Sequence, residues 1–372
     1  MDFEFTEDQQ SLRDVVRRWV DKAFPFERRH RIAKAGGAAR DVFRELAQLG
    51  LTGLAIPETH GGMGFGAVEA MVVMEELGRG LVNAPYAQGA LIAPAAFAHA
   101  RAELQAIWLP RIADGSALVA LAHQERSARY RLGEVHTRAG GDAGGIWMLD
   151  GAKNVVPAGD EADAFIVPAH TQQGIQLFLV DKGAAGSQLR GYPTHDGARA
   201  AELTLSGTPG VVVAREGMLV LERAVDVGIA AACAEGVGLM ERLLEITVEY
   251  LNTRRQFNVA LATFQALRHR VVDMKMQLEL ARSMSYLATL RLGDAPDVRR
   301  RALSQAKVQL GHSMRFVGQQ AIQLHGGIGV ADEYVASHYF KRLAMLELAF
   351  GDTLHHLGEV SARMQETAGV FA

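Results

Sequence analysis

The sequence predicts an α+β protein: an N-terminal helical domain, a small antiparallel β-domain and a C-terminal four-helix bundle. Three observations lead to this prediction. Apolar residues near the start recur at helical spacing, short apolar runs separated by turn residues fill the middle, and the last third contains a single proline. The predicted domains are residues 1–116, 117–218 and 219–372.

The first domain is predicted from the spacing of its apolar residues. Between Glu7 and Ala23 they recur every three or four residues, as in a helix with one buried face. A second helix ends at Gly50, and helical signals resume over Ala67–Leu77 and Ala102–Ile112.

The middle domain is predicted from short apolar runs that alternate with Gly, Asp and Pro. Such runs are typical of strands, and their spacing leaves no room for crossover helices. This favours antiparallel pairing in a small sandwich or barrel. The runs are Ile146–Leu149, Ala164–Val167, Leu177–Val180 and Val211–Val213.

The last domain is predicted to be a bundle of four helices. Its proline, Pro296, stands where a helix can begin, because the first helical position needs no backbone donor. The expected helices are Leu219–Thr253, Phe264–Leu292, Pro296–His325 and Asp332–Thr367.

Composition argues against several classes of function. Lys and Arg total 39 against 42 Asp and Glu, so the net charge of −3 favours neither nucleic acid nor an anionic membrane. We expect no signal peptide and no membrane insertion, because no apolar stretch is long enough to span a bilayer. The single cysteine, Cys233, excludes an internal disulfide and suits a cytoplasmic protein.

One segment whose side chains could bind a ligand lies at the predicted end of a helix. Arg254 and Arg255 suit a helix C-terminus and can pair with a diphosphate, while Gln256 offers an amide and Phe257 a flat apolar face. By itself this pattern is more typical of a solvated helix end.

A second segment, Gln323–Gly329, is rich in glycine and lies between two predicted helices. Gly326 and Gly327 can adopt positive φ angles and let a bound group approach the backbone closely. A plain helix cap and turn explains them equally well, and no strand precedes them as in a dinucleotide fingerprint.

A third segment places four polar side chains on one face of the last predicted helix. Such a cluster can bind a metal, but no second helix offers a matching carboxylate and histidine set. A solvated or salt-bridged face is the better explanation. The four residues are Asp352, His355, His356 and Glu359.

In this order, and on this helix–strand–helix plan, the segments resemble the acyl-CoA dehydrogenase family over essentially the whole chain. Leu54–Glu58, Gly61–Gly62 and Glu75–Gly78 add to the resemblance. It implies α,β-dehydrogenation of an acyl-CoA thioester, in which a carboxylate takes the α-proton and hydride leaves to FAD. An electron-transfer flavoprotein or a similar protein would accept the electrons.

The resemblance also assigns the cofactor contacts by position. In the family, FAD lies between the β-domain and the bundle, and its adenosine diphosphate end reaches a neighbouring subunit, which implies an obligate oligomer. Arg254 would meet the pyrophosphate, flanked by Gln256 and Phe257. The adenosine end would meet Gln323, Gly326 and Gly327.

The β-domain residues at the positions that contact the flavin in the family depart from the family pattern. The flavin-lining Trp-Ile-Thr of relatives falls on Val155-Val156-Pro157, so that a hydroxyl and a backbone donor are lost. A Thr-Glu pair near the flavin becomes Gln124-Glu125.

The base position departs as well. The Glu of the family's Glu-Gly-Thr triplet falls on Phe350, whose side chain accepts no proton but whose N–H can still polarise the thioester carbonyl. Some relatives carry the base on the first bundle helix, at a position that falls on Gly228. The carboxylates near these two positions are Asp352, Asp226 and Glu222, each a weak substitute.

These departures resemble the smaller subunits of bacterial heteromeric acyl-CoA dehydrogenases. Some of those enzymes act on dicarboxylic or sterol-derived thioesters, and a homologous partner can supply the base. The sequence leaves open a homo-oligomer or a heteromer with a homologous subunit. It also leaves open a flavoprotein that uses Asp352 on another carbon acid, such as a nitroalkane, and a scaffold that has lost the flavin.

Overall fold

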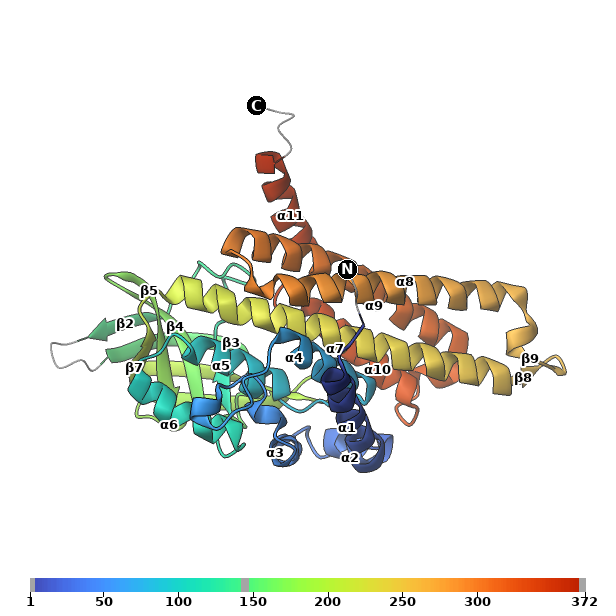
Figure 1. Cartoon of the computed structure of the whole chain (residues 1–372), viewed down its shortest axis with the longest axis horizontal. Coiled ribbons are helices and arrows are strands. Elements are labelled where there is room, and N and C mark those ends of the chain that lie inside the picture. Colours follow the sequence, from blue (N-terminus) through green and yellow to red (C-terminus); the bar gives the residue numbers. More distant parts are fainter. Residues whose placement is uncertain (1–3, 142–146, 368–372) are drawn as a thin grey trace. The chain divides into compact units, whose positions relative to one another are not determined.

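The structure is a computed structural model that describes residues 4–141 and 147–367 (Figure 1). These residues form two compact units. The first comprises the residues up to Arg29, Ala67–Val82 and those from Ile229 onward, and the second comprises His30–Gly66 and Asn83–Gly228. The domain boundaries expected at residues 116 and 218 stay a prediction.

The first unit is helical. The predicted helices Glu7–Ala23 and Pro296–His325 are confirmed with their bounds, and the first begins with a capping box between Thr6 and Gln9. The helices of this unit are α1 (Glu7–Ala23), α4 (Ala67–Arg79), α8 (Gln265–Leu290), α9 (Pro296–His325), α10 (Val335–Leu348) and α11 (Thr353–Thr367), and α2 (Phe26–Lys34) and α7 (Gly217–Thr253) contribute residues to both units. A short hairpin of β8 (Arg255–Gln256) and β9 (Val259–Ala260) follows α7.

Glycine lets α4 and α7 approach each other closely. A β-carbon on Gly238 would collide with the carbonyl oxygen of Glu75, and one on Gly78 would collide with that of Glu235. Only a hydrogen fits at these two positions. The long helices α8 and α9 run side by side in Figure 1, with the β8–β9 hairpin at one end of the unit.

The prediction of one last helix over Asp332–Thr367 is wrong. The structure has α10 and α11, separated by a turn at Ala349–Asp352, so five α-helices rather than four follow residue 216 in the described part of the chain. The reason lies in two backbone angles. Phe350 has a φ of 59° and Gly351 a φ of 116°, and neither is compatible with a right-handed helix.

The second unit contains a β-sheet that closes on itself. β4 pairs with β2 and β5, and β2–β3, β3–β7 and β5–β7 complete the ring, so the barrel alternative is confirmed. Antiparallel pairing throughout is wrong, because β1 and β2 each run parallel to β4. The strands are β1 (Val119–Leu121), β2 (Arg138–Gly141), β3 (Trp147–Pro157), β4 (Ala164–Thr171), β5 (Gly174–Asp181), β6 (Ser187–Pro193) and β7 (Arg199–Ala214).

Parallel pairing is possible because long connections precede β4. β1 ends at Leu121 and β2 begins only at Arg138, and neither strand is joined to β4 by a tight hairpin. The predicted strand at Ile146–Leu149 is confirmed from Trp147 onward, while Ile146 lies outside the described residues.

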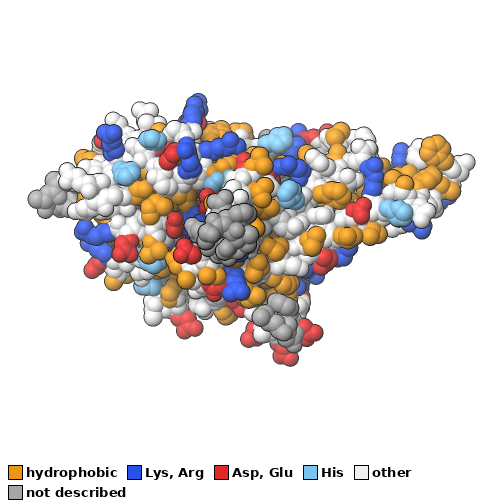
Figure 2. Space-filling view, turned by 90° about the horizontal axis from the view of Figure 1, so that it is seen from above, with side chains coloured by type: hydrophobic (Ala, Val, Ile, Leu, Met, Phe, Trp, Pro, Cys, Tyr) orange, Lys and Arg blue, Asp and Glu red, His pale blue; other side chains and the backbone are white. Residues whose placement is uncertain are grey.

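The barrel encloses its own apolar core, which includes Leu149, Phe165, Phe178 and Leu203. Short helices complete this unit: α3 (Arg40–Gln48), η1 (Leu51–Gly53), η2 (Glu58–His60), the π-helical η3 (Ala87–Ile92), α5 (Ala93–Phe97) and α6 (Ala102–Ala113). No helix within the described ranges is both long and apolar enough to cross a membrane. In Figure 2 basic and acidic side chains are interspersed over the visible face, as the net charge of −3 suggests.

Candidate active site

The turn between α10 and α11 carries Phe350 in a strained conformation. A non-glycine residue with a φ of 59° costs free energy, so the surroundings must hold it there. Gly351, with a φ of 116°, is required next to it, because a β-carbon at this position would lie 2.6 Å from Nε2 of His356. Phe350 itself is half-buried.

Lys307 of α9 holds this turn from inside the unit. Its side chain is 1% exposed, and Nζ donates to the carbonyl oxygens of Leu346, Glu347 and Gly351 at 2.9, 2.8 and 2.9 Å. An ammonium group has three N–H donors, so every donor is used. Burial lowers the pKa of Lys307 to about 8.

A carboxylate ties the two sides of the turn together. Glu347, in the last turn of α10, accepts hydrogen bonds from the backbone N–H and the hydroxyl of Thr353 at 3.1 and 2.7 Å. Arg315 also donates to it, at 3.2 Å. Glu347 is 8% exposed, so these hydrogen bonds lie at the buried base of the turn.

His356 closes the turn from α11. Its Nε2 lies 3.1 Å from the carbonyl oxygen of Phe350, and its Nδ1 lies 3.2 Å from Oγ of Ser304. A carbonyl oxygen only accepts, so Nε2 carries the proton and Nδ1 accepts from the serine. Burial lowers the pKa of His356 to about 3, so the ring is neutral at physiological pH.

The four polar residues of the third segment have separate roles. Asp352 caps α11, since its Oδ1 accepts from the backbone N–H of His355 at 2.8 Å. Glu359 pairs with Arg363 at 3.2 Å, as expected for a salt-bridged face, but His356 is buried rather than solvated. Among the residues described, these four do not form a group with metal-ligand geometry.

The alternative base position lies in the first turns of α7. Gly228 is buried there, Asp226 is 2% exposed and Glu222 is half-buried. The glycine itself offers no proton acceptor.

The residues assigned to the pyrophosphate follow the end of α7. Arg254 and Gln256 are exposed, and Phe257 is 85% exposed at the tip of the β8–β9 hairpin with a φ of 51°. Positive φ at both Phe257 and Asn258 (66°) matches the tight turn that joins two antiparallel strands. The described residues offer no side-chain partner to the Arg254 guanidinium, whereas Arg255 donates to the carbonyl of Asn258 at 2.8 Å.

The glycine-rich segment lies at the same end of the helical unit. Tyr250 of α7 donates to the carbonyl oxygen of His325 at 3.2 Å, and their ring centroids are 4.6 Å apart. Gly326 has a φ of 64° and a ψ of −142°, which only glycine adopts readily. Gln323, Gly326 and Gly327 are exposed, and β-carbons on the two glycines would meet nothing within 4 Å. The fold therefore brings the first two sequence segments together.

In the second unit, Glu125 is engaged in a buried ion pair. Lys153 of β3, 0% exposed, donates to its Oε1 at 2.6 Å, and Thr137 donates its hydroxyl to the same atom at 2.7 Å. Burial raises the pKa of Glu125, but Lys153 and the hydrogen bonds outweigh it, so the net pKa is lowered.

This ion pair lies next to an irregularity in β3. The register against β7 shifts between Lys153 and Val156, and Val155 within the shift has a φ of 49° and is 45% exposed. Pairing resumes at Val156 opposite Ala201, and Pro157, opposite Ala200, is half-buried.

Comparison with known proteins identifies the family. The family descriptions "Acyl-CoA dehydrogenase, N-terminal domain" and "Acyl-CoA dehydrogenase, C-terminal domain" match residues 6–116 and 215–365. Acyl-CoA dehydrogenase IpdE2 of Mycobacterium tuberculosis (strain ATCC 25618 / H37Rv) is 32% identical over 341 residues, which cover 90% of this chain and 91% of the relative. The chain belongs to the acyl-CoA dehydrogenase family.

Two solved structures support the assignment over the full length. The ChsE4-ChsE5 complex from Mycobacterium tuberculosis matches with a TM-score of 0.89 at 28% identity, covering 99% of this chain and 100% of that chain. A variant of the Tcur3481-Tcur3483 steroid ACAD matches with a TM-score of 0.89 at 29% identity, covering 98% of this chain and 99% of that chain. The order of helical, barrel and helical segments in this chain is that of the family.

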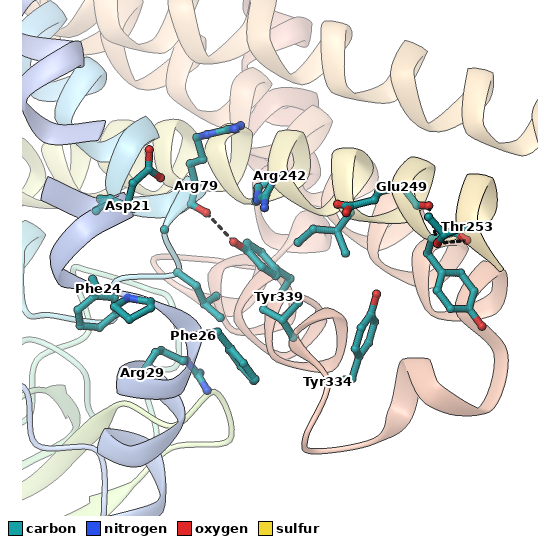
Figure 3. Close-up of a pocket in the computed structure, with 17 residues that line it drawn as sticks. Asp21, Phe24, Phe26, Arg29, Arg79, Arg242, Glu249, Thr253, Tyr334 and Tyr339 are labelled. Carbon is teal, nitrogen blue, oxygen red and sulfur yellow. Dashed lines mark hydrogen bonds between the residues drawn. The ribbon is translucent and has the colours of Figure 1, made fainter. Parts of the chain in front are cut away.

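A cavity of about 570 Å³ lies within the helical unit, and Phe350 is not among its lining residues (Figure 3). It is lined by aromatic rings and by charges of both signs. Two of its arginines are already paired, since Arg79 and Arg242 both donate to Glu245, and Tyr339 donates to the carbonyl of Arg79. The aromatic lining residues are Phe24, Phe26, Tyr250, Tyr334 and Tyr339.

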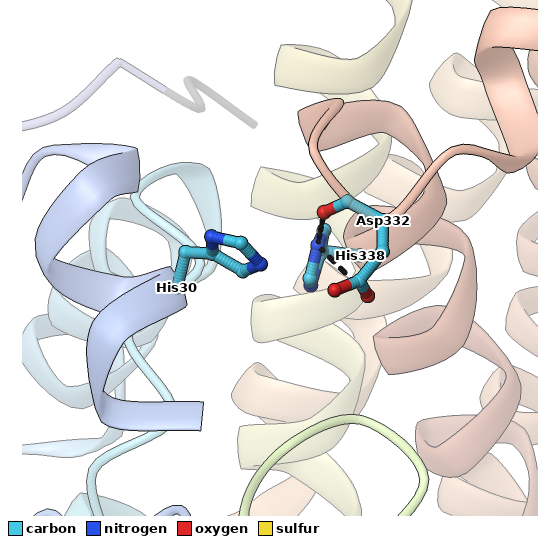
Figure 4. Close-up of side chains that lie close together, drawn as sticks. All are labelled: His30, Asp332 and His338. Carbon is cyan, nitrogen blue, oxygen red and sulfur yellow. Dashed lines mark hydrogen bonds and ion pairs between the residues drawn. The ribbon is translucent and has the colours of Figure 1, made fainter. Parts of the chain in front are cut away.

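The loop before α10 is anchored by a buried histidine beside this cavity. Nε2 of His338 donates to the carbonyl oxygen of Asp332 at 2.7 Å (Figure 4). Lys341 pairs with the Asp332 carboxylate at 3.3 Å. Nδ1 of His338 contacts Arg29. These contacts fix the start of α10, whose other end carries the Phe350 turn.

Sequence reasoning missed the two buried lysines. A signal for Lys307 exists: it lies four residues after Leu303 and three before Leu310, on the face of α9 that is buried. A lysine on an apolar face needs acceptors inside the protein. Lys153 lies in the stretch Asp150–Asn154 of β3, which has no run of large apolar residues, and no comparable signal marks it as buried.

Proposed function

We propose that this chain is an FAD-binding subunit of a heteromeric acyl-CoA dehydrogenase that carries out α,β-dehydrogenation of an acyl-CoA thioester with a homologous partner. The partner supplies the catalytic base. The electrons removed from the acyl-CoA pass to an electron-transfer flavoprotein or a similar acceptor. The single, buried cysteine suits the reducing cytoplasm.

The observation that carries this proposal is the Phe350 turn. Buried charges on α9 and α10 and a neutral histidine on α11 hold a strained turn whose central side chain accepts no proton. A protein that had lost all function at this point would gain nothing from maintaining the strain. The turn keeps a backbone N–H at Phe350, which could still donate to a thioester carbonyl after the loss of the base.

Among the described residues, no substitute base is well placed at this turn. Asp352 is the nearest carboxylate in sequence, and its Oδ1 is engaged in capping α11. If Asp352 left that position, the backbone N–H of His355 in the first turn of α11 would lose this acceptor. This geometry weighs against the hypothesis that Asp352 deprotonates another carbon acid.

Two features support retention of the cofactor. The Arg254 guanidinium is exposed at the end of α7 and is available to a pyrophosphate, with Gln256 and Phe257 beside it. Gln323, Gly326 and Gly327 present an open, backbone-rich surface for the adenosine end. FAD would supply the acceptor for the β-hydride, and these residues would hold its diphosphate end.

Support for the partner comes from the two structural relatives. Each is named for a pair of proteins, ChsE4-ChsE5 and Tcur3481-Tcur3483, and the second is called a steroid ACAD. On this basis we propose a sterol-derived or similarly bulky acyl group.

The proposal is tested by purifying the chain alone and with the product of a neighbouring homologous gene, then measuring flavin absorbance and acyl-CoA-dependent reduction of an artificial acceptor. The expected result is flavin in the complex and activity only in the complex. Full activity of the lone chain on a simple acyl-CoA would contradict the partner version. A complex without flavin at the sites of this chain would favour the scaffold hypothesis.

A further inference from the structure

We propose that Lys307 is a positioning residue for the reaction: it fixes the Phe350 turn so that the backbone N–H of Phe350 polarises the thioester carbonyl without any help from a catalytic carboxylate. This inference rests on the proposed function. Lys307 touches neither substrate nor cofactor and acts only through the turn.

The lysine fulfils a hydrogen-bonding need that the turn itself creates. The last carbonyl groups of a helix have no intrahelical donor. In α10 two such groups, those of Leu346 and Glu347, accept from Nζ of Lys307 at 2.9 and 2.8 Å. The third acceptor, the carbonyl of Gly351 at 2.9 Å, lies beyond Phe350. One ammonium group therefore spans the turn from its start to its end.

The charge of the lysine suits this place. A helix C-terminus carries partial negative charge, and a buried cation there is attracted to the carbonyl dipoles. The side chain is 1% exposed, so this cation is removed from bulk solvent. Without Lys307, three carbonyl groups would be left buried without this donor.

Other contacts make the turn rigid but do not replace the lysine. Thr353 bonds Glu347 across the turn, and His356 bonds the carbonyl of Phe350 within it, but neither contact reaches the carbonyl of Gly351. Among the side chains that the structure describes, only that of Lys307 links the end of α10 to Gly351. Because a donor that stabilises developing negative charge must be held to within a fraction of an ångström, loosening this link displaces the N–H from the carbonyl.

The test uses the complex with the partner subunit and a chromophoric ligand, a dimethylaminocinnamoyl-CoA thioester. The absorption of a conjugated thioester moves to longer wavelength when its carbonyl is polarised. Lys307→Met keeps an unbranched side chain, one atom shorter, and removes its donors. Lys275→Met on α8, which removes an exposed pair with Glu279, is the matched control.

The expected result is a red shift in the wild-type complex and in the Lys275→Met control, and loss of most of the shift in Lys307→Met at saturating ligand. Turnover in Lys307→Met falls by about 100- to 1,000-fold, as for loss of one oxyanion donor, while KM changes little. A wild-type complex that binds no acyl-CoA would refute the proposed function itself. A full red shift in a folded Lys307→Met complex would overturn the inference about Lys307 alone.

Hydrogen exchange of the wild-type complex keeps the inference testable if Lys307→Met does not fold. A turn positioned by Lys307 is ordered before the ligand arrives, so the amides of peptides that cover residues 346–353 are protected without ligand. Rapid exchange of these amides in the ligand-free complex, followed by protection on binding, would overturn the inference.

Discussion

Nε2 of His356 lies 3.1 Å from the carbonyl oxygen of Phe350, six residues earlier in the chain. This hydrogen bond joins the start of α11 to the turn to which the sequence resemblance assigns the family's base. It requires a neutral ring with its proton on Nε2, because Nδ1 accepts from Ser304 at 3.2 Å. The turn is thus held by a group that is itself unable to act as a strong base, since its pKa is lowered to about 3.

Replacing His356 by Leu is expected to destabilise the protein. The carbonyl of Phe350 and the hydroxyl of Ser304 would lose their partner in a buried site, at a combined cost of about 2 to 4 kcal/mol. Urea unfolding of the variant measures this loss. His355→Leu, at a half-buried position, is the control and should cost less than about 1 kcal/mol. Equal losses in the two variants would contradict the assigned role.

The lowered pKa of His356 also predicts that the stability of the protein depends on pH. Its folded-state pKa of about 3 lies below its ordinary value of 6.5, so the unfolded chain binds the proton more tightly. Its stabilising contribution is complete above pH 6.5 and is lost as the pH falls toward 3. The free energy of unfolding of the wild type should therefore decrease between these values more steeply than that of His356→Leu. Parallel curves would refute this prediction.

The raised pKa of Glu75 predicts the opposite dependence of stability on pH. It is 5% exposed, with Arg13 at 2.9 Å, and burial raises its pKa from 4.5 to about 7. The folded state binds this proton more tightly, so the contribution is complete below pH 4.5 and is lost as the pH rises through 7. Glu75→Gln should remove a decrease of up to about 3 kcal/mol between about pH 5 and pH 8, measured by urea unfolding. An unchanged pH profile in the variant would show that Glu75 titrates normally.

Introducing a carboxylate at Phe350 is expected to give the lone chain activity. Phe350→Glu restores a proton acceptor on a turn that is already in place, and a general base contributes about 100- to 10,000-fold in rate. Flavin reduction by acyl-CoA under anaerobic conditions measures the gain. Phe350→Gln, of the same shape but without a base, should stay inactive. A gain in both variants would mean that side-chain size, not proton transfer, limits the lone chain.

The ion pair between Glu125 and Lys153 is expected to show strong coupling. Lys153→Met leaves a buried carboxylate without its main partner and should cost about 3 to 5 kcal/mol. Glu125→Gln leaves the lysine buried and should also destabilise. The double variant should lose less than the sum of the two, by about 1 to 3 kcal/mol, in a double-mutant cycle of urea unfolding. Additive losses would show that the two groups act independently.

Arg254 is expected to control cofactor affinity. Arg254→Ala removes the guanidinium that is available to a pyrophosphate, and loss of one charge-assisted pair of hydrogen bonds should weaken FAD binding about tenfold or more. Arg255→Ala is the neighbouring control, because Arg255 already donates to Asn258. The flavin content of the purified complexes and titration of the apoprotein measure the difference. Equal FAD affinity in the two variants would contradict the pyrophosphate assignment.

The sequence predicted the order of helical and β-elements because periodicity depends on local spacing. The bounds of α1 and α9 were predicted fully, since a capping box and a proline mark where each begins. The break between α10 and α11 was missed because a single Gly351 in an apolar run is compatible with a helix. The parallel pairing of β1 with β4 was missed because the partner of a strand is a non-local property.

The sequence by itself predicted the fold class and the family resemblance, and it assigned the family's base position to Phe350. Each depends on which residue stands at which position. Only the tertiary structure decided how the Phe350 turn is held. Lys307, Glu347 and His356 belong to three helices and are brought to one turn by packing, and their buried donors and acceptors must pair because water is excluded there. The structure likewise shows that Asp352, a candidate base in the sequence, caps α11.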